Sequence, residues 1–506
     1  MSEITEQLNK QLKNNQSEKI IKDEKMDRWF TGREISEDVE QLKQVFVRQK
    51  IGYQDVVLIC LPNMAAYPVI TQAIWEVGAI MHPIAATTPE SELLAEINEN
   101  TYAGYFVEDQ MAEYIQNYRS TQLATGELNT VNNLNLLIDQ TNLHHDAKTP
   151  AENDLALIMN TSGTTGKPKR VGLSHKILFN AVEHDIESHQ LTEQDTVLVI
   201  MPMFHINAQA VCLLSTRLSG GKIVVAEKFS ASKFWDQVKN NHVTWVSVVP
   251  TIINILLLNQ KANDRYSDDI KLRFVRSSSF SLPIDKLTEF QQRFHTVILE
   301  GYGMTETASQ CTINPFSQRK IGSAGKPFKT EVAIVNEGKT TQQANKLGEI
   351  AVKGDHVISH YLDVQTDSFH NGWFLTGDLG YFDSEGYLFV KGRKKDIINH
   401  GGEKVSPAQV ENSLSQLDFV KEVAVIATPD LLYGEAVTAV IISRSPMDEN
   451  EQRQDLMTHA TETLANYERP TRIYFVKDFP RNPTGKVLRK QLQSQIISMS
   501  AEEVHE

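Results

Sequence analysis

The chain has 506 residues, of which 41% are hydrophobic and 23% charged. This composition is ordinary for a soluble globular protein and excludes disordered and fibrous classes. The formal net charge of -14 argues against a nucleic-acid partner or general binding to anionic membranes, because both need a net basic surface. Cys60, Cys212 and Cys311 stand far apart, which gives no zinc pattern and fits a reducing compartment. With no apolar run of membrane-spanning length and no signal peptide, we expect a cytoplasmic protein without a membrane span.

Strand-like and helix-like segments alternate between about residue 55 and residue 310. VVLICL (56–61) is a predicted buried strand, and the next segment has helical spacing, with Ile70, Ile74 and Val77 on one face. Further along, strands are predicted at 223–229, 243–250, 272–279 and 296–303, with helices at 231–242, 251–260 and 283–294. Such alternation predicts parallel sheets covered by helices, with ligands at the carboxyl ends of the strands. The polar, Asn-rich residues 120–150 are predicted to be surface loops.

The later part of the chain changes character. Between residues 322 and 392 short strands are separated by turn sequences, which predicts an antiparallel part. Beyond it we predict helices at 407–417 and 451–467, strands at 423–428, 436–443 and 472–477, and a basic helix from Lys486. Ser406 is a predicted N-cap, with Gln409 as its capping-box partner. We therefore predict an α/β fold: a large N-terminal domain (1–394) of parallel sheets with helices plus an antiparallel β part, and a small α+β C-terminal domain (395–506).

The strongest motif is TSGTTGKPK (161–169), which follows the apolar strand LALIM. Its glycines permit backbone conformations closed to other residues, and its hydroxyls, amides and lysines suit phosphate oxygens. It is not a Walker A loop, because Thr161 replaces the first glycine and Pro168 replaces the hydroxyl residue that would hold magnesium. An ordinary Gly/Thr turn is the structural alternative.

Three further segments follow in order: GYGMTET (301–307), WFLTGD (373–378) with GRKKD (392–396), and PTGK (483–486). Together with TSGTTGKPK they resemble the motifs of the adenylate-forming superfamily, which includes acyl-CoA synthetases, luciferases and peptide-synthetase adenylation domains. The resemblance implies an AMP-forming ligase that uses ATP, Mg²⁺ and coenzyme A. It also implies that the small domain rotates about Lys395-Asp396 between two half-reactions.

The resemblance assigns roles residue by residue. Glu306 is the implied Mg²⁺ ligand, Thr305 contacts the α-phosphate, Asp378 binds the ribose hydroxyls with Arg393 nearby, and Lys486 bridges the carboxylate and the α-phosphate. His205 lines the acyl site and gates the thiol channel. The implied nucleotide, acyl and pantetheine contacts are Thr161, Ser162, Gly163, Thr164, Thr165, Gly166, Lys167, Ser279, Gly301, Tyr302, Gly303 and Gly402. Taken singly, each residue is more often structural: Asp378 as a turn cap, Lys486 as a surface lysine and His205 as a structural histidine.

The expected pocket lining is polar. Ser277 to Ser281, His205 and Ser309 favour a small or polar carboxylic acid, because a long apolar chain needs apolar walls. Segments such as FSASKFWDQV and HGGEKVSPAQVE resemble plant and fungal oxalate–CoA ligases, and partly carnitine-type CoA ligases. Two departures are Ser309, where a histidine is expected, and Arg170, where glycine is usual.

Three alternatives stay open. The first alternative concerns the substrate, which would be a medium- or long-chain fatty acid. The second is a stand-alone adenylation enzyme that loads a carrier protein. The third is a nucleotide-binding regulator without catalysis. Coenzyme A is the preferred acceptor because no carrier domain is appended.

Overall fold

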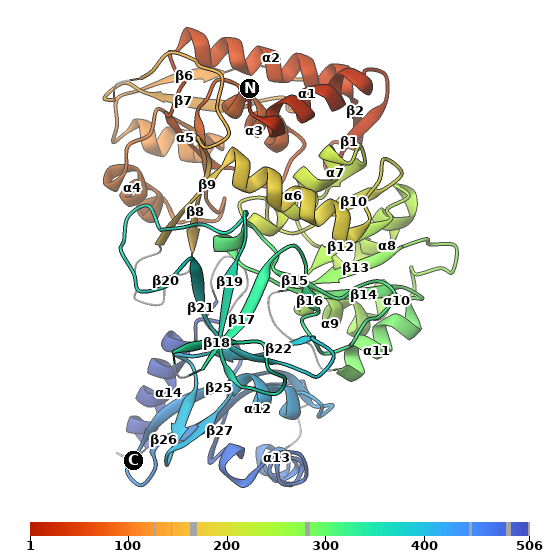
Figure 1. Cartoon of the computed structure of the whole chain (residues 1–506), viewed down its shortest axis with the longest axis vertical. Coiled ribbons are helices and arrows are strands. Elements are labelled where there is room, and N and C mark those ends of the chain that lie inside the picture. The colour runs from red at the N-terminus through yellow and green to blue at the C-terminus, as the bar shows by residue number, and fades with distance from the viewer. Residues whose placement is uncertain are drawn as a thin grey trace.

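The computed structural model describes residues 1–125, 127–142, 144–161, 169–278, 284–336, 338–444, 448–481 and 487–503. Within them the strands form four sheets. Two large sheets and the N-terminal helices lie at one end of the molecule, the C-terminal sheet lies at the other, and an antiparallel sheet lies between (Figure 1). None of the described helices combines the length and the apolar character needed to cross a membrane.

The first large sheet has nine strands, and most of its neighbours are parallel. In spatial order they are β16 (Lys326–Pro327), β15 (Thr312–Ile313), β14 (Val297–Tyr302), β13 (Phe274–Ser277), β12 (Trp245–Val248), β10 (Thr196–Val199), β11 (Lys222–Val225), β1 (Lys19–Asp23) and β2 (Arg28–Thr31). The predicted alternation in 223–303 is confirmed. Fully buried, mainly apolar runs such as Trp245–Val248, in which Ser247 is the one polar residue, form these strands because helices cover both faces of a parallel sheet.

The second large sheet has seven strands. In spatial order they are β6 (Thr121–Thr125), β7 (Asn135–Asp139), β5 (Gly104–Val107), β3 (Val56–Cys60), β4 (Ile80–Pro83), β8 (Leu155–Thr161) and β9 (Lys169–Ser174). The prediction of loops throughout 120–150 is wrong, because β6 and β7 form an antiparallel hairpin there. Every residue of β7 is buried. The apolar centre of this segment therefore determines that it forms a strand, despite the polar residues on either side.

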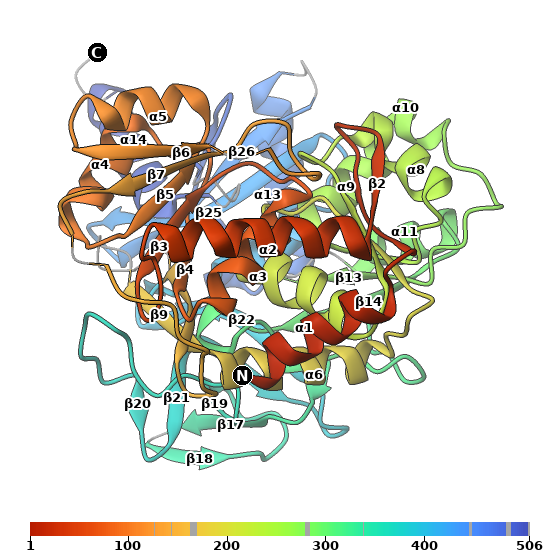
Figure 2. The same ribbon diagram turned by 90° about the horizontal axis from the view of Figure 1, so that it is seen from above.

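Helices cover both large sheets. They are α1 (Glu3–Asn14), α2 (Gly32–Arg48), α3 (Ala66–Glu76), α4 (Glu90–Glu99), α5 (Asp109–Gln116), α6 (His175–His189), α7 (Ser215–Leu218), α8 (Ala231–Asn240), α9 (Pro250–Leu258), α10 (Gln260–Asn263) and α11 (Ile284–Arg293). Figure 2 shows α1, α2 and α3 lying together on one side. All of Ala66–Trp75 is buried, so α3 is enclosed on every side rather than on the one predicted face.

The antiparallel prediction for 322–392 is confirmed. Its strands are β18 (Lys339–Thr341), β17 (Glu331–Asn336), β19 (Gly348–Lys353), β21 (Trp373–Phe382), β20 (Phe369–His370) and β22 (Leu388–Arg393). Val57 of β3, Val197 of β10 and Val352 of β19 belong to one continuous apolar core. The three N-terminal sheets are therefore held together by a shared interior.

The C-terminal sheet is antiparallel except for one edge. It consists of β24 (Glu403–Val405), β23 (Ile398–His400), β26 (Gly434–Ser443), β25 (Val420–Asp430) and β27 (Arg472–Phe475), with helices α12 (Pro407–Leu414), α13 (Glu449–Thr463) and α14 (Arg489–Glu503). Ser406 caps α12 as predicted. The other half of the predicted capping box, a contact from the Gln409 side chain back to Ser406, is wrong. The Gln409 side chain instead donates to Glu468 at 2.7 Å.

Candidate functional site

The end of β14 meets the β21–β22 hairpin at a buried carboxylate. Asp378 is 6% exposed and pairs directly across the hairpin with Arg393. Arg393 Nε lies 2.7 Å from Asp378 Oδ1, and the Tyr302 hydroxyl donates to Asp378 Oδ2 at 2.7 Å. Burial and the Asp378 charge raise the pKa of Tyr302. The structure therefore brings together three residues that the sequence predicted to lie in one site.

A second carboxylate lies on the short 3₁₀ turn Thr305–Thr307. Glu306 Oε1 accepts a hydrogen bond of 2.8 Å from the Tyr361 hydroxyl. The Lys169 ammonium lies 4.5 Å from the centre of the Tyr361 ring. Burial and the Glu306 charge raise the pKa of Tyr361. Tyr361 was not among the predicted residues, yet it connects Glu306 to the end of the 161–169 motif.

The β8–β9 hairpin fixes both ends of that motif, since Thr161 pairs with Lys169 in the antiparallel register. Arg170 donates to the Asn100 side chain at 2.6 Å. Seven of the predicted nucleotide and acyl contacts and the predicted catalytic lysine lie outside the described residues. They are Ser162, Gly163, Thr164, Thr165, Gly166, Lys167 and Ser279, and Lys486.

Two glycines are needed where the 301–311 segment folds back on itself. A Cβ at Gly303 would lie 1.8 Å from the Ser309 carbonyl oxygen, and one at Gly301 would lie 3.0 Å from the Thr312 carbonyl oxygen. Glycine at both positions lets β15 return beside β14, which leaves Thr305 and Glu306 on the turn between the two strands. The predicted Gly402 is different, because a Cβ there would meet nothing within 4 Å and the residue lies in the turn between β23 and β24.

His205 precedes a π-helical segment, η1 (Asn207–Leu214), which the sequence did not predict. Burial lowers the pKa of His205 to about 4, so the imidazole is neutral at pH 7, and His205 Nδ1 accepts from the Asn207 amide at 3.3 Å. The Asn207 side chain donates to Ser278 at the end of β13 at 3.3 Å. Such π-helical insertions are rare and frequent at functional sites.

A buried charged cluster lies behind Ser278 and was missed by the sequence analysis. Arg276 is 1% exposed and donates through Nη1 to Ser278 Oγ at 2.9 Å. Asp185 on α6 is fully buried and accepts from Ser309 at 3.1 Å. Burial raises the pKa of Asp185 to about 7, although the Arg276 charge opposes this shift. Arg276 Nε and Asp185 Oδ1 have no hydrogen-bond partner among the described residues.

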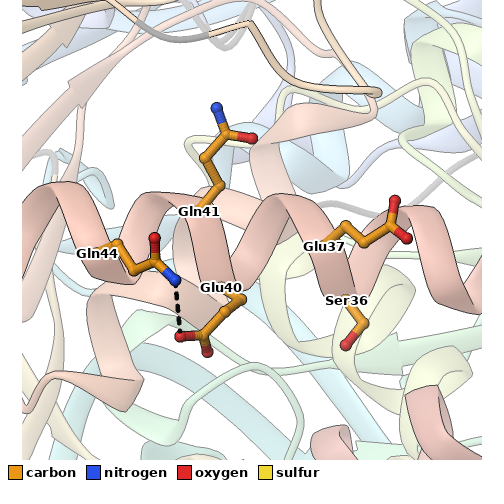
Figure 3. Close-up of a pocket in the computed structure, with 5 residues that line it drawn as sticks. All are labelled: Ser36, Glu37, Glu40, Gln41 and Gln44. Carbon is orange, nitrogen blue, oxygen red and sulfur yellow. Dashed lines mark hydrogen bonds between the residues drawn. The ribbon is translucent and has the colours of Figure 1, made fainter.

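A surface hollow along α2 has none of these features. It is lined by Ser36, Glu37, Glu40, Gln41 and Gln44, all on one helix (Figure 3). Its side chains are polar and mostly exposed, and α2 lies at the N-terminal end, away from β21 and β22 (Figure 1). The hollow is therefore not part of the candidate site.

The chain has the mixed α/β fold of adenylating enzymes, and it carries the carboxylates Asp378 and Glu306 beside the folded-back 301–311 segment. The chain belongs to the AMP-binding enzyme family, which it matches over residues 8–362, and it matches the AMP-binding enzyme C-terminal domain over residues 409–486. The relatives of the chain in this family are named as CoA ligases, and they are of the AMP-forming type.

Two relatives and one solved structure illustrate the similarity. The oxalate–CoA ligase of Arabidopsis thaliana is 32% identical, over 86% of this chain and 87% of the relative. The sulfoacetate–CoA ligase of Cupriavidus necator is 36% identical, over 69% of each. The o-succinylbenzoate CoA synthetase of Bacillus subtilis, solved with its acyl-adenylate intermediate, has a TM-score of 0.81 and 25% identity, over 96% of this chain and 97% of that one.

Proposed function

We propose that the chain is an ATP-dependent acyl-CoA ligase that converts a carboxylic acid, ATP and coenzyme A into acyl-CoA, AMP and pyrophosphate. The observation that carries this proposal is the convergence of two polar groups, Tyr302–Asp378–Arg393 and Glu306–Tyr361–Lys169, beside the hairpin that bears the 161–169 motif. The membership of the AMP-binding enzyme family supports the reaction class.

In the first half-reaction a carboxylate oxygen attacks the α-phosphorus of ATP, and pyrophosphate leaves. Asp378, held by Arg393 and Tyr302, presents a fixed carboxylate suited to the two ribose hydroxyls. Glu306 offers the oxygen ligand that Mg²⁺ prefers, and Thr305 lies next to it for the α-phosphate. The 161–167 segment contributes amides, hydroxyls and Lys167 to the β- and γ-phosphates. Positioned donors and cations of this kind stabilise charge that shifts onto the leaving oxygens.

We further propose that residues 1–394 and 395–506 are two domains and that Lys486 enters the site from the smaller one. Two apolar clusters of the C-terminal sheet contain only residues from Ile398 onward, as expected of a unit with its own core. Withdrawal of Lys486 would then let a thiol reach the acyl carbonyl beside His205. The bond from carbon to the adenylate oxygen breaks, and AMP leaves. Gly402 remains the proposed point of close approach to pantetheine.

The proposed substrate is a small acid with a second anionic or strongly polar group. Arg276 is a buried guanidinium that interacts electrostatically with the buried Asp185, and it also donates to Ser278, which directly follows β13, so its positive charge is available beside the proposed acyl site. Asn207 and Ser309 add further polar groups. Ser309 stands where oxalate–CoA ligases are expected to carry a histidine, and Arg276 offers a cation near that position in its place. A buried cation also disfavours a fatty acyl chain.

We propose coenzyme A rather than a carrier protein as the acceptor, and the cytoplasm as the location. The named relatives are CoA ligases, which supports the acceptor. Cys60, Cys212 and Cys311 are buried free thiols, which supports a reducing compartment.

An acid panel tests the function and the substrate class together. Pyrophosphate release is measured with oxalate, malonate, succinate, propionate, butyrate, crotonobetaine, hexanoate and palmitate, with and without coenzyme A. We expect a short dianion to give the highest kcat/KM and AMP release to depend on coenzyme A. Preference for palmitate would refute the substrate class. Acceptance of the acyl group only by a phosphopantetheinylated carrier would refute the choice of acceptor.

A further inference from the structure

Two histidines and an aspartate converge where α6 faces the segment after β19. His184 lies on α6, and Asp355 and His356 follow Lys353, the last residue of β19. Their ligand atoms all lie within 4.8 Å of one another. Asp355 Oδ1 is 3.4 Å from His356 Nδ1 and 3.7 Å from His184 Nε2. The second separation is too long for a hydrogen bond, whereas ligands around a tetrahedral Zn²⁺ stand about 3.3–3.5 Å apart, given metal–ligand distances near 2.0–2.1 Å.

The hydrogen bonds of His356 fix which of its ring nitrogens is available. His356 Nε2 lies 3.0 Å from the Gln310 carbonyl oxygen, which can only accept, so Nε2 carries the hydrogen. The lone pair is then on Nδ1, which faces Asp355. Histidines that bind metals usually donate their other ring N–H in this way.

Burial and charge also suit a metal ion. The side chains of His184 and His356 are 12% and 1% exposed, whereas that of Asp355 is 58% exposed. Burial lowers the pKa of both histidines. The exposed side of Asp355 provides access for an ion and room for water.

We propose that His184, Asp355 and His356 bind one Zn²⁺ ion, with water as a fourth ligand. The ligand set of two imidazoles and one carboxylate matches zinc chemistry. None of the three ligands is among the proposed nucleotide contacts, although the segment that carries Asp355 and His356 also contacts Glu306, whose carbonyl oxygen accepts from the Ile358 amide at 3.0 Å. It joins α6, which carries Asp185, to the segment that continues to Tyr361, so the ion clamps two elements that support the proposed active site.

The test uses full-length protein without a polyhistidine tag, treated with chelator and then titrated with Zn²⁺ against a chromogenic competitor. We expect one ion per chain at micromolar or lower Kd and a rise in Tm with Zn²⁺. Co²⁺ should give the visible absorption of a tetrahedral site. His184→Ala and Asp355→Asn should each weaken binding at least tenfold and remove the rise in Tm.

His360→Ala is the matched control, because His360 lies on the same segment and its ring bonds only Ser359 among the described contacts. It should bind Zn²⁺ as the wild type does. Asp355 is exposed, so Asp355→Asn should fold normally, which its Tm without metal verifies. Absence of stoichiometric Zn²⁺ binding to the wild type, or equal binding by the wild type and both ligand variants, would overturn the proposal.

Discussion

Lys486→Ala should lower the rate of acyl-adenylate formation by about 10²–10³-fold, the usual cost of removing one group that stabilises transition-state charge. The proposed ammonium lies between two negatively charged reactants, so its loss affects the first half-reaction. Thioester formation from a supplied acyl-adenylate should change by less than a few-fold. The two rates are measured separately, by acid-dependent pyrophosphate release and by conversion of synthetic acyl-adenylate with coenzyme A.

Lys421→Ala is a suitable control, since Lys421 is an exposed lysine on β25 of the same C-terminal sheet. Both half-reactions should keep wild-type rates in that variant. An equal loss of both half-reactions in Lys486→Ala would show that this lysine is structural, or that the two-conformation scheme is incorrect.

Arg276→Gln should lower kcat/KM for a dianionic acid by about 10- to 100-fold, as expected for a charge-assisted hydrogen bond of about 1.5–3 kcal/mol. For a monoanionic acid of similar length, such as propionate against malonate, the change should be much smaller. The preference for dianions should therefore fall. Steady-state kinetics with both acids, together with the KM for ATP as an internal reference, provide the measurement.

Arg273→Gln is the matched control. Arg273 immediately precedes β13, but it pairs with Asp195 at 3.1 Å and not with Ser278 or Asp185. Arg276→Lys keeps the charge and should restore part of the dianion preference, which distinguishes recognition from folding. An unchanged ratio between the two acids in Arg276→Gln would eliminate Arg276 as the specificity residue.

Periodicity predicted the sheet architecture because each strand of a parallel sheet is a continuous apolar run between helices. The same logic failed at 135–139, where a short buried strand is surrounded by asparagines. It also failed at Gln409, because local capping signals do not reveal that Glu468 lies within reach.

The site was predicted in part. Tyr302, Asp378 and Arg393 meet as the motifs implied, but Tyr361 carries no motif and is brought in only by tertiary folding. Arg276 did carry a signal, since a charged residue inside the apolar strand segment FVRS must be paired or functional. The π-helical segment Asn207–Leu214 lacks such a signal, because its apolar sequence suits an α-helix equally well.

Transfer of ¹⁸O from a labelled carboxylic acid is the most direct test of acyl-adenylate chemistry at this site. Attack of the carboxylate on the α-phosphorus followed by thiol attack on the carbonyl leaves one carboxylate oxygen on the phosphate of AMP. Mass spectrometry should find one ¹⁸O atom in AMP for each acyl-CoA formed and none in pyrophosphate. Label in a released phosphate, formation of ADP, or acyl-CoA formed beside unlabelled AMP would contradict the account.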